Sequence, residues 1–157
     1  MLTTLRIKNL ALVPDLTLEL QPGCNVITGE TGAGKSIIIG ALNLVLGERA
    51  DRSLIRSGSD SCSVEAMFDV AKLKSPLKSF LNENGIEPCE DHQLVLKRTF
   101  TSTGTNRQFV NGSATTLNVL ATIVSETPGS SGPLDDVVAS IARFAEPVIG
   151  LPRVRTA

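Results

Sequence analysis

The chain has 157 residues, of which 41% are hydrophobic and 20% are charged, and this balance is typical of a globular domain rather than a disordered chain. Fifteen Lys and Arg residues against sixteen Asp and Glu residues give a net charge of -1, which excludes a global positive field that would attract nucleic acid or anionic lipid. With five Phe and no Trp or Tyr, the chain also lacks the aromatic side chains on which single-strand-binding surfaces stack bases. Any contact with DNA must therefore be local.

Cysteine and histidine are few and indicate neither a disulfide framework nor a zinc site. Cys24, Cys62, Cys89 and the single histidine, His92, form no CxxC pair, and we interpret them as structural or surface residues. The N-terminus has no continuous apolar stretch, and the richest apolar run, residues 37–46, is too short to span a bilayer. We therefore expect a soluble protein of the reducing cytoplasm with no membrane partner.

The first third of the chain predicts strands followed by a buried helix. Polar and apolar residues alternate over residues 5–8 and 16–20, with the period of two that is typical of half-buried strands. Pro22 and Gly23 then suit a turn into a short strand at residues 24–28. Residues 35–46, KSIIIGALNLVL, are apolar on nearly every side, which predicts a helix that is buried on most faces and stops at Gly47.

The middle of the chain continues with strands and one short helix. The same alternation predicts three further strands, at residues 63–70, 93–100 and 107–110. Asn111 and Gly112 come next and are the dipeptide best suited to a type I′ hairpin turn. Thr116 then has the position to cap a helix that runs to Ile123.

A compositional break divides the chain after this helix. Residues 126–133, ETPGSSGP, combine Pro, Gly and Ser, which do not sustain a helix or a central strand. We therefore predict one domain over residues 1–123 and a linker with a short tail over residues 124–157. Within the tail, only residues 137–145 have the apolar spacing of a helix.

A phosphate-binding motif lies between the strand predicted at residues 24–28 and the buried helix. Eight residues match G-x-x-x-x-G-K-[ST] in full: Gly29, Glu30, Thr31, Gly32, Ala33, Gly34, Lys35 and Ser36. The glycines allow backbone N–H groups to face phosphate oxygens, and the helix N-terminus adds unpaired donors and a positive dipole end. Lys35 is expected to reach the β- and γ-phosphates of ATP, and the Ser36 hydroxyl to bind Mg²⁺. The simpler alternative is an incidental glycine-rich turn.

ATP hydrolysis needs groups beyond this motif. It requires a carboxylate on the metal, a group that orients water and a positive charge opposite the phosphates. Asp69, at the end of the predicted strand at residues 63–70, comes closest to a metal carboxylate, although a solvated aspartate at a strand end is the simpler interpretation. We therefore assign no catalytic residue and predict little or no turnover by this chain alone.

Three arginines follow the predicted helix, in the segment GERADRSLIRSG. Arg49, Arg52 and Arg56 would form a phosphate-contacting patch on duplex DNA if they gathered on one side. Glu48 and Asp51 lie in the same segment and lower its net positive charge. The residue types therefore also fit a solvated, ion-paired loop.

Four segments resemble the N-terminus of the RecN family of bacterial DNA repair proteins: LRIKNLALVPDLTLEL, VITGETGAGKSIIIGALNLVLGERADRSLIRSG, VEAMFDV and NRQFVNG. The resemblance covers residues 1–123, and the family is an SMC-like branch of the ABC ATPases. It implies an α/β P-loop fold, here the N-terminal half of an ATP-binding head with antiparallel strands beside the nucleotide-binding core. It also implies paired heads that sandwich ATP and act on DNA double-strand breaks. By position, it implies nucleotide contacts at residues 29–36, Mg²⁺ at Ser36 and DNA contact by Arg52 or Arg56.

The chain departs from the RecN pattern after Ile123. It continues with VSETPGSSGPLDD, where the family has a glutamine-bearing loop and a coiled coil, and it contains no ABC signature, Walker B strand or switch histidine. We therefore expect a truncated or frame-shifted product, located in the cytoplasm at the nucleoid. Its expected partners are ATP, DNA through the family's assembly, and the missing C-terminal half of the head or a second head. Two alternatives stay open: a stand-alone P-loop kinase or phosphotransferase, and a non-functional interaction fragment that exposes apolar surface.

Overall fold

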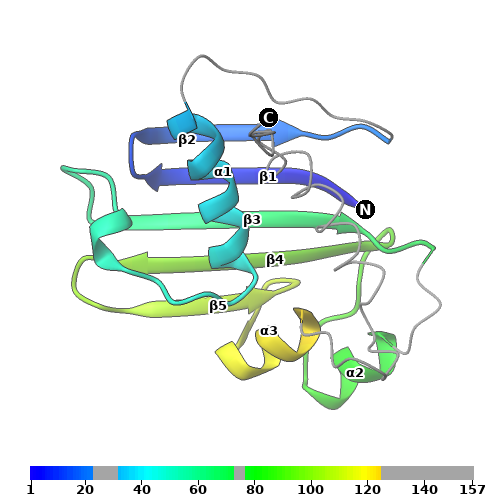
Figure 1. Cartoon of the computed structure of the whole chain (residues 1–157). Helices are drawn as coiled ribbons and strands as arrows, with labels where there is room; N and C mark the ends of the chain where they lie inside the picture. The colour runs from blue at the N-terminus through cyan, green and yellow to red at the C-terminus, as the bar shows by residue number, and fades with distance from the viewer. Residues whose placement is uncertain (23–31, 73–76, 125–157) are drawn as a thin grey trace, which may run out of the picture.

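The structure, a computed structural model, describes residues 1–22, 32–72 and 77–124, and of residues 32–35 and 124 it describes the backbone only. The strands described form one sheet, in the order β2-β1-β3-β4-β5-β6, and all neighbours are antiparallel (Figure 1). They are β1 (Leu2–Leu10), β2 (Val13–Glu19), β3 (Ser61–Asp69), β4 (Gln93–Thr101), β5 (Asn106–Val110) and β6 (Ser113–Thr115). The helices described are α1 (Gly32–Val45), η1 (Arg52–Leu54), a 3-10 helix, α2 (Leu77–Glu83) and α3 (Leu117–Val124).

The strands predicted at residues 5–8 and 16–20 are confirmed as the hairpin of β1 and β2. Leu5 lies opposite Leu18 and Ile7 opposite Leu16, so the apolar side chains of both strands share one face. Both strands are longer than predicted because backbone pairing continues beyond the alternating residues. The predicted antiparallel arrangement of the N-terminal and middle strands is therefore confirmed.

The turn chemistry that the sequence predicts after β5 is also confirmed. Asn111 and Gly112 join β5 to β6 with φ values of 49° and 81°, the two positive values that a type I′ turn requires. Thr116 precedes α3, and its Oγ1 accepts the N–H of Val119 at 3.2 Å, which is the predicted helix cap.

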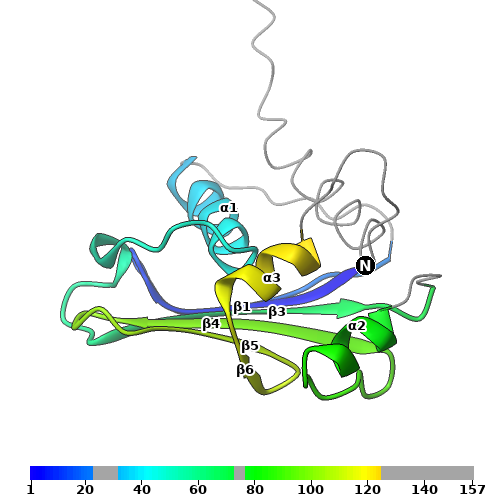
Figure 2. The same cartoon turned by 90° about the horizontal axis from the view of Figure 1, so that it is seen from below.

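The helices give the sheet a covered face and an uncovered face. α1 and α3 lie on one face of the sheet, and α2 lies beside one end of it (Figure 2). On the covered face, the alternate residues of β3 and β4 are buried, whereas those on the opposite face are mostly only half-buried. Among the described residues, the buried layer is apolar except for Arg98 and Gln108.

α1 ends at Val45, and the predicted stop, Gly47, is the positive-φ residue of a Schellman motif that follows it. The N–H of Glu48 donates to the carbonyl of Asn43 at 3.0 Å, and the N–H of Gly47 donates to the carbonyl of Leu44 at 3.2 Å. Gly47 has a φ of 108°, which strains any residue that carries a Cβ. Glycine is needed here for its conformation and not for space, because a Cβ would meet its nearest atoms, in α3, only at 3.9 Å.

Among the described elements, the sequence-based prediction names neither α2 nor η1, and it gives the turn at Asn111 and Gly112 without the strand β6 that follows it. In α2, Leu77 and Leu81 are buried four residues apart on one side of the helix. Gly85 follows with a φ of 66°, and the N–H of Ile86 donates to the carbonyl of Leu81 at 2.8 Å. This glycine stop just after a short apolar pair is the signal that would have revealed α2.

Several sequence predictions fall on residues outside the described ranges. These are the strand at residues 24–28 and the break and helix of the tail. Among the helices that the structure does describe, none has the length and apolar character needed to cross a membrane.

Replacement of Gly47 by alanine is expected to lower the free energy of unfolding by about 1–2 kcal/mol, because an L-residue must adopt positive φ there. The matched control is Gly40→Ala inside α1, where a Cβ would meet nothing within 4 Å. We expect this control to raise stability by about 0.5–1 kcal/mol, the helix preference of Ala over Gly. Urea unfolding followed by circular dichroism measures both, and equal effects would contradict the role of Gly47.

Candidate functional site: the ends of helix α1

The phosphate-binding motif leads directly into α1. Gly32 is the first residue of the helix, and the backbone of residues 32–35 forms its first turn. Ser36 follows with an exposed side chain, while Gly29, Glu30 and Thr31 lie outside the described residues. The N–H groups of a first helical turn have no partner within the helix and lie at the positive end of its dipole. This end of α1 therefore has the backbone groups that bind an anion.

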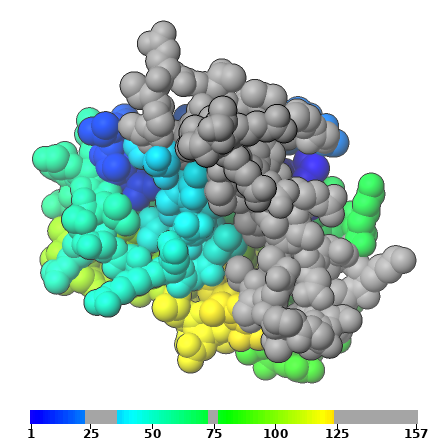
Figure 3. All heavy atoms as spheres, in the orientation of Figure 1, coloured from blue at the N-terminus to red at the C-terminus, as the bar shows by residue number. Residues whose placement is uncertain are grey.

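The body of α1 is buried against the sheet. Ile38, Ala41, Leu42 and Val45 are at most 5% exposed, and the helix packs mainly on β3 and also on β1 and β4. In the orientation of Figure 1, α1 (cyan) forms the surface between the strands of the N-terminal hairpin and α3 (yellow) (Figure 3). Burial is confirmed for the side of the helix that faces the sheet, whereas Ile37, Ile39, Gly40 and Asn43 are half-buried and Ser36 is exposed, so the helix is less buried than the sequence predicts.

A buried arginine of β4 holds the C-terminus of α1. Arg98 is 1% exposed, and its Nη1 donates to the carbonyl of Leu44 at 2.7 Å and to the carbonyl of Glu48. Its Nε donates to Oδ1 of Asn106 at 3.1 Å, and the same oxygen accepts from Nε2 of Gln108 at 3.0 Å. The guanidinium therefore joins the end of α1 to β4 and β5.

Carbonyl oxygens, not carboxylates, compensate the charge of Arg98, since none of the ion pairs among the described residues includes it. Burial lowers the pKa of the guanidinium, which nevertheless keeps its charge in a protein. The negative end of the α1 dipole faces this charge, an interaction that contributes up to about 2 kcal/mol when partly buried. The sequence contains a signal for this buried charge. Arg98 lies in the alternating pattern of β4 at the same face as the buried residues Leu94, Leu96 and Phe100.

Asp69, the candidate metal carboxylate, closes a local turn. Its Oδ1 accepts the N–H of Ala71 at 2.9 Å, and its backbone carbonyl accepts the N-terminal ammonium group of Met1 at 2.6 Å. Within residues 1–22, 32–72 and 77–124, no three His, Cys, Asp or Glu side chains are grouped to hold a metal ion. The structure thus favours a solvated aspartate at a strand end.

Two of the three arginines after α1 line the same hollow, and Arg56 does not. The hollow lies between the segment after α1 and the β4–β5 turn, and its lining is Arg49, Ala50, Asp51, Arg52, Phe100, Thr101, Gly104, Thr105 and Asn106. Arg52 Nη1 donates to the carbonyl of Ser102 at 3.4 Å. Arg56 is exposed, and its N–H donates to the carbonyl of Asn9 at 2.9 Å.

Asp51 keeps its negative charge in this hollow. Its Oδ1 accepts the N–H of Ser53 at 2.9 Å, and this hydrogen bond holds the pKa of the Asp51 carboxyl below its usual value. The side chains of Arg49, Arg52 and Asp51 therefore leave one net positive charge, which is a small patch for contact with phosphate.

The described cysteines and the histidine have structural or surface positions, as the sequence predicts. Cys62 is 1% exposed in the core, and burial raises the pKa of its thiol to about 12. Burial also raises the pKa of the Cys89 thiol, against a hydrogen bond from Asn111. His92 is exposed in a turn with a φ of 58°, and Cys24 lies outside the described residues.

Comparison with known proteins gives consistent results. Residues 4–128 match the model of the AAA domain family, AAA_23. DNA repair protein RecN of Vibrio cholerae is 43% identical over 123 residues, which are 78% of this chain and 22% of the relative. Among solved structures, the SMC head domain from Thermotoga maritima is 26% identical with a TM-score of 0.56 over 74% of this chain and 39% of that chain. A structure from a study of SMC ATPases has a TM-score of 0.64 at 20% identity and covers 92% of this chain and 90% of that chain.

These likenesses, together with a complete phosphate-binding motif at the start of α1, define the fold as that of a P-loop ATPase head of the SMC type. The chain belongs to the AAA domain family. Its sequence is similar to the N-terminal part of RecN proteins, at 43% identity to the Vibrio cholerae relative and 37% to the Synechocystis relative. It spans 22% of the length of the curated RecN relatives from Vibrio cholerae and Synechocystis.

Replacement of Arg98 by methionine is expected to lower the free energy of unfolding by about 2–3 kcal/mol, because the carbonyl of Leu44 loses a charged donor in a buried setting. Arg107→Met is the matched control, since Arg107 is exposed on neighbouring β5, and we expect a change within about 0.5 kcal/mol. Urea unfolding measures both variants. An Arg98→Met protein as stable as the control would show that the helix end does not need this guanidinium.

Proposed function

We propose that this chain binds ATP with Mg²⁺ as the nucleotide-binding part of a RecN-type DNA repair ATPase. The observation that carries the proposal is the complete motif at residues 29–36 running into a helix whose middle and end are packed against the sheet. Its relatives are named DNA repair proteins, which supports a role in DNA repair. We extend the proposal to double-strand breaks because the resemblance of its segments to the RecN family implies that substrate. Within the described residues, nothing favours the alternative of a stand-alone kinase.

The roles proposed for the motif follow from its chemistry. The backbone of residues 29–34 would surround the phosphates, and Lys35 would place its ammonium group near the β- and γ-phosphates. The Ser36 hydroxyl would hold a Mg²⁺ ion bound together with the nucleotide. When bound, the metal neutralises negative charge that develops on the phosphates.

Turnover of ATP by this chain alone is expected to be low. Among the described residues, Asp69 is not part of any group of three His, Cys, Asp or Glu side chains that could hold a metal ion. The groups that orient water and stabilise the transition state would come from another part of the head or from a second head, and these are the proposed protein partners.

DNA contact is proposed for the hollow that holds Arg49 and Arg52. Both guanidinium groups line one concave surface beside the hydroxyl groups of Thr101 and Thr105, and these groups bind phosphate oxygens in protein–DNA complexes. Arg56 is a weaker candidate, because it does not line this hollow. Such contacts would hold the DNA backbone without reading sequence.

The location and the domain boundary follow from the same proposal. A DNA repair ATPase works in the cytoplasm at the nucleoid, which is where we place this chain. The boundary near residue 123 stays a prediction, and the family match, which ends at residue 128, lies close to it.

Replacement of Lys35 by alanine is expected to weaken binding of labelled ATP with Mg²⁺ at least tenfold, because the phosphates lose a direct positive charge. Lys78→Ala, an exposed lysine of α2, is the matched control and should bind as the unchanged chain does. ATP at about a hundred times its Kd should also add about 2.7 kcal/mol to stability. Equal affinity of the Lys35 and Lys78 variants would refute the proposed site.

Replacement of Arg52 by alanine is expected to weaken binding of a short DNA duplex and to reduce the slope of log affinity against log salt by about one. The Arg56→Ala variant is the comparison, and its loss should be smaller because Arg56 lies outside the hollow. Fluorescence anisotropy over a range of salt concentrations measures both. A larger loss for Arg56→Ala would move the contact away from the hollow.

A further inference from the structure

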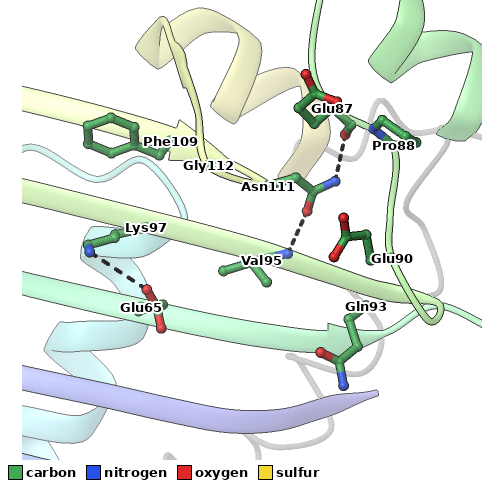
Figure 4. A pocket seen from close by; sticks show the side chains of 10 residues that line it. All are labelled: Glu65, Glu87, Pro88, Glu90, Gln93, Val95, Lys97, Phe109, Asn111 and Gly112. Atoms are coloured by element: carbon green, nitrogen blue, oxygen red, sulfur yellow. Dashed lines mark hydrogen bonds and ion pairs between the residues drawn. The ribbon is translucent and has the colours of Figure 1, made fainter.

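A second hollow lies on the face of the sheet opposite α1. It has a volume of about 660 Å³ and is lined by Glu65, Glu87, Pro88, Glu90, Gln93, Val95, Lys97, Phe109, Asn111 and Gly112 (Figure 4). Its floor consists of outward-facing residues of β3, β4 and β5, and one wall is the segment between α2 and β4. No role proposed above uses this hollow.

The floor of the hollow combines apolar surface with a neutralised ion pair. Val95 and Phe109 are half-buried although they lie on the face away from α1. Beside them, Lys97 lies 3.8 Å from the Glu65 carboxylate on the neighbouring strand. The floor therefore has no net charge, and it is suited to an aliphatic side chain.

The wall of the hollow is acidic. Residues 83–92 contain four carboxylates, at Glu83, Glu87, Glu90 and Asp91, and no Lys or Arg, although the whole chain has a net charge of only -1. Glu87 and Glu90 line the hollow, and neither forms an ion pair with another described residue. Figure 4 shows Glu90 between Asn111 and Gln93. The uncompensated charge of this hollow is therefore negative, which disfavours DNA.

Asn111 holds the wall and the floor together. Its Oδ1 accepts the N–H of Val95 at 2.9 Å, and its Nδ2 donates to the carbonyl of Glu87 at 2.9 Å (Figure 4). A second brace runs from the N–H of Glu87 to Oγ of Ser113 at 3.1 Å. Asn111 belongs to the FVNG segment, so the type I′ turn that ends β5 also fixes this hollow. A preformed wall loses little conformational freedom when a partner binds.

We propose that this hollow is a docking site for an extended segment of a protein partner that carries lysine or arginine beside aliphatic residues. The aliphatic stem of the basic side chain lies on Val95 and Phe109, and its charged head faces Glu87 and Glu90. An arginine or lysine near the ring of Phe109 gains a further cation–π attraction. The charge of the wall selects this class of partner, and the proposal is independent of ATP and DNA binding.

The test uses the full chain and a labelled peptide, Lys-Val-Arg-Val-Lys, with Glu-Val-Glu-Val-Glu as the peptide of opposite charge. We expect saturable binding of the basic peptide, with amide NMR shifts at Val95, Phe109 and Asn111. Glu87→Gln with Glu90→Gln should weaken binding about fivefold, because each exposed charge pair contributes modestly. Glu83→Gln is the matched control, since it removes a carboxylate of the same segment that does not line the hollow.

Each other result overturns the proposal. An equal loss in Glu83→Gln would mean nonspecific attraction to an acidic segment. No binding of the basic peptide, or equal binding of the acidic peptide, would contradict the proposal that the hollow binds basic segments. Shifts confined to amides outside the hollow would place the peptide elsewhere, and equal competition by free arginine would indicate a small-cation site instead of a peptide site. Circular dichroism of the double variant shows whether a loss arises from unfolding.

Discussion

A positive charge buried at the end of α1 is the interaction on which the rest of the structure depends. The last carbonyl groups of a helix have no partner within the helix, and leaving them buried without donors is unfavourable. Gly47 turns the chain so that the carbonyls of Leu44 and Glu48 converge on the Arg98 guanidinium. Because Arg98 belongs to the central strand β4, the contact fixes α1 against the sheet as well as completing its hydrogen bonds.

The same helix dipole has a role at both ends of α1. At its C-terminus the dipole stabilises the buried cation Arg98, and at its N-terminus it favours an anion next to the motif at residues 29–36. Between these ends, Ala41 and Val45 have no exposed surface. The part of α1 from Ile38 onward is therefore held against the sheet, and the proposed phosphate site lies at the helix end that precedes this anchored part.

Local patterns predicted most of the described fold, and long-range contacts account for what they missed. The period of two gives the strands, and Asn111 with Gly112 gives the turn after β5, because both depend on neighbouring residues only. The motif at residues 29–36 is likewise contiguous. Arg98 differs, because its partners are 50 and 54 residues away and no local pattern predicts them. The separation of Arg49 and Arg52 from Arg56 is also set by tertiary structure, since it depends on the β4–β5 turn.

The two hollows lie at opposite ends of β4 and differ in charge. Gln93 and Val95 at the start of the strand line the acidic hollow, whereas Phe100 and Thr101 at its end line the hollow with Arg49 and Arg52. A chain with almost no net charge thus separates opposite charges along one central strand. A polyanion and a basic peptide would therefore be attracted to different ends of the sheet and would not compete for one surface. Arg98 lies on β4 between the two hollows and binds the end of α1. The strand that anchors α1 therefore also connects the two hollows.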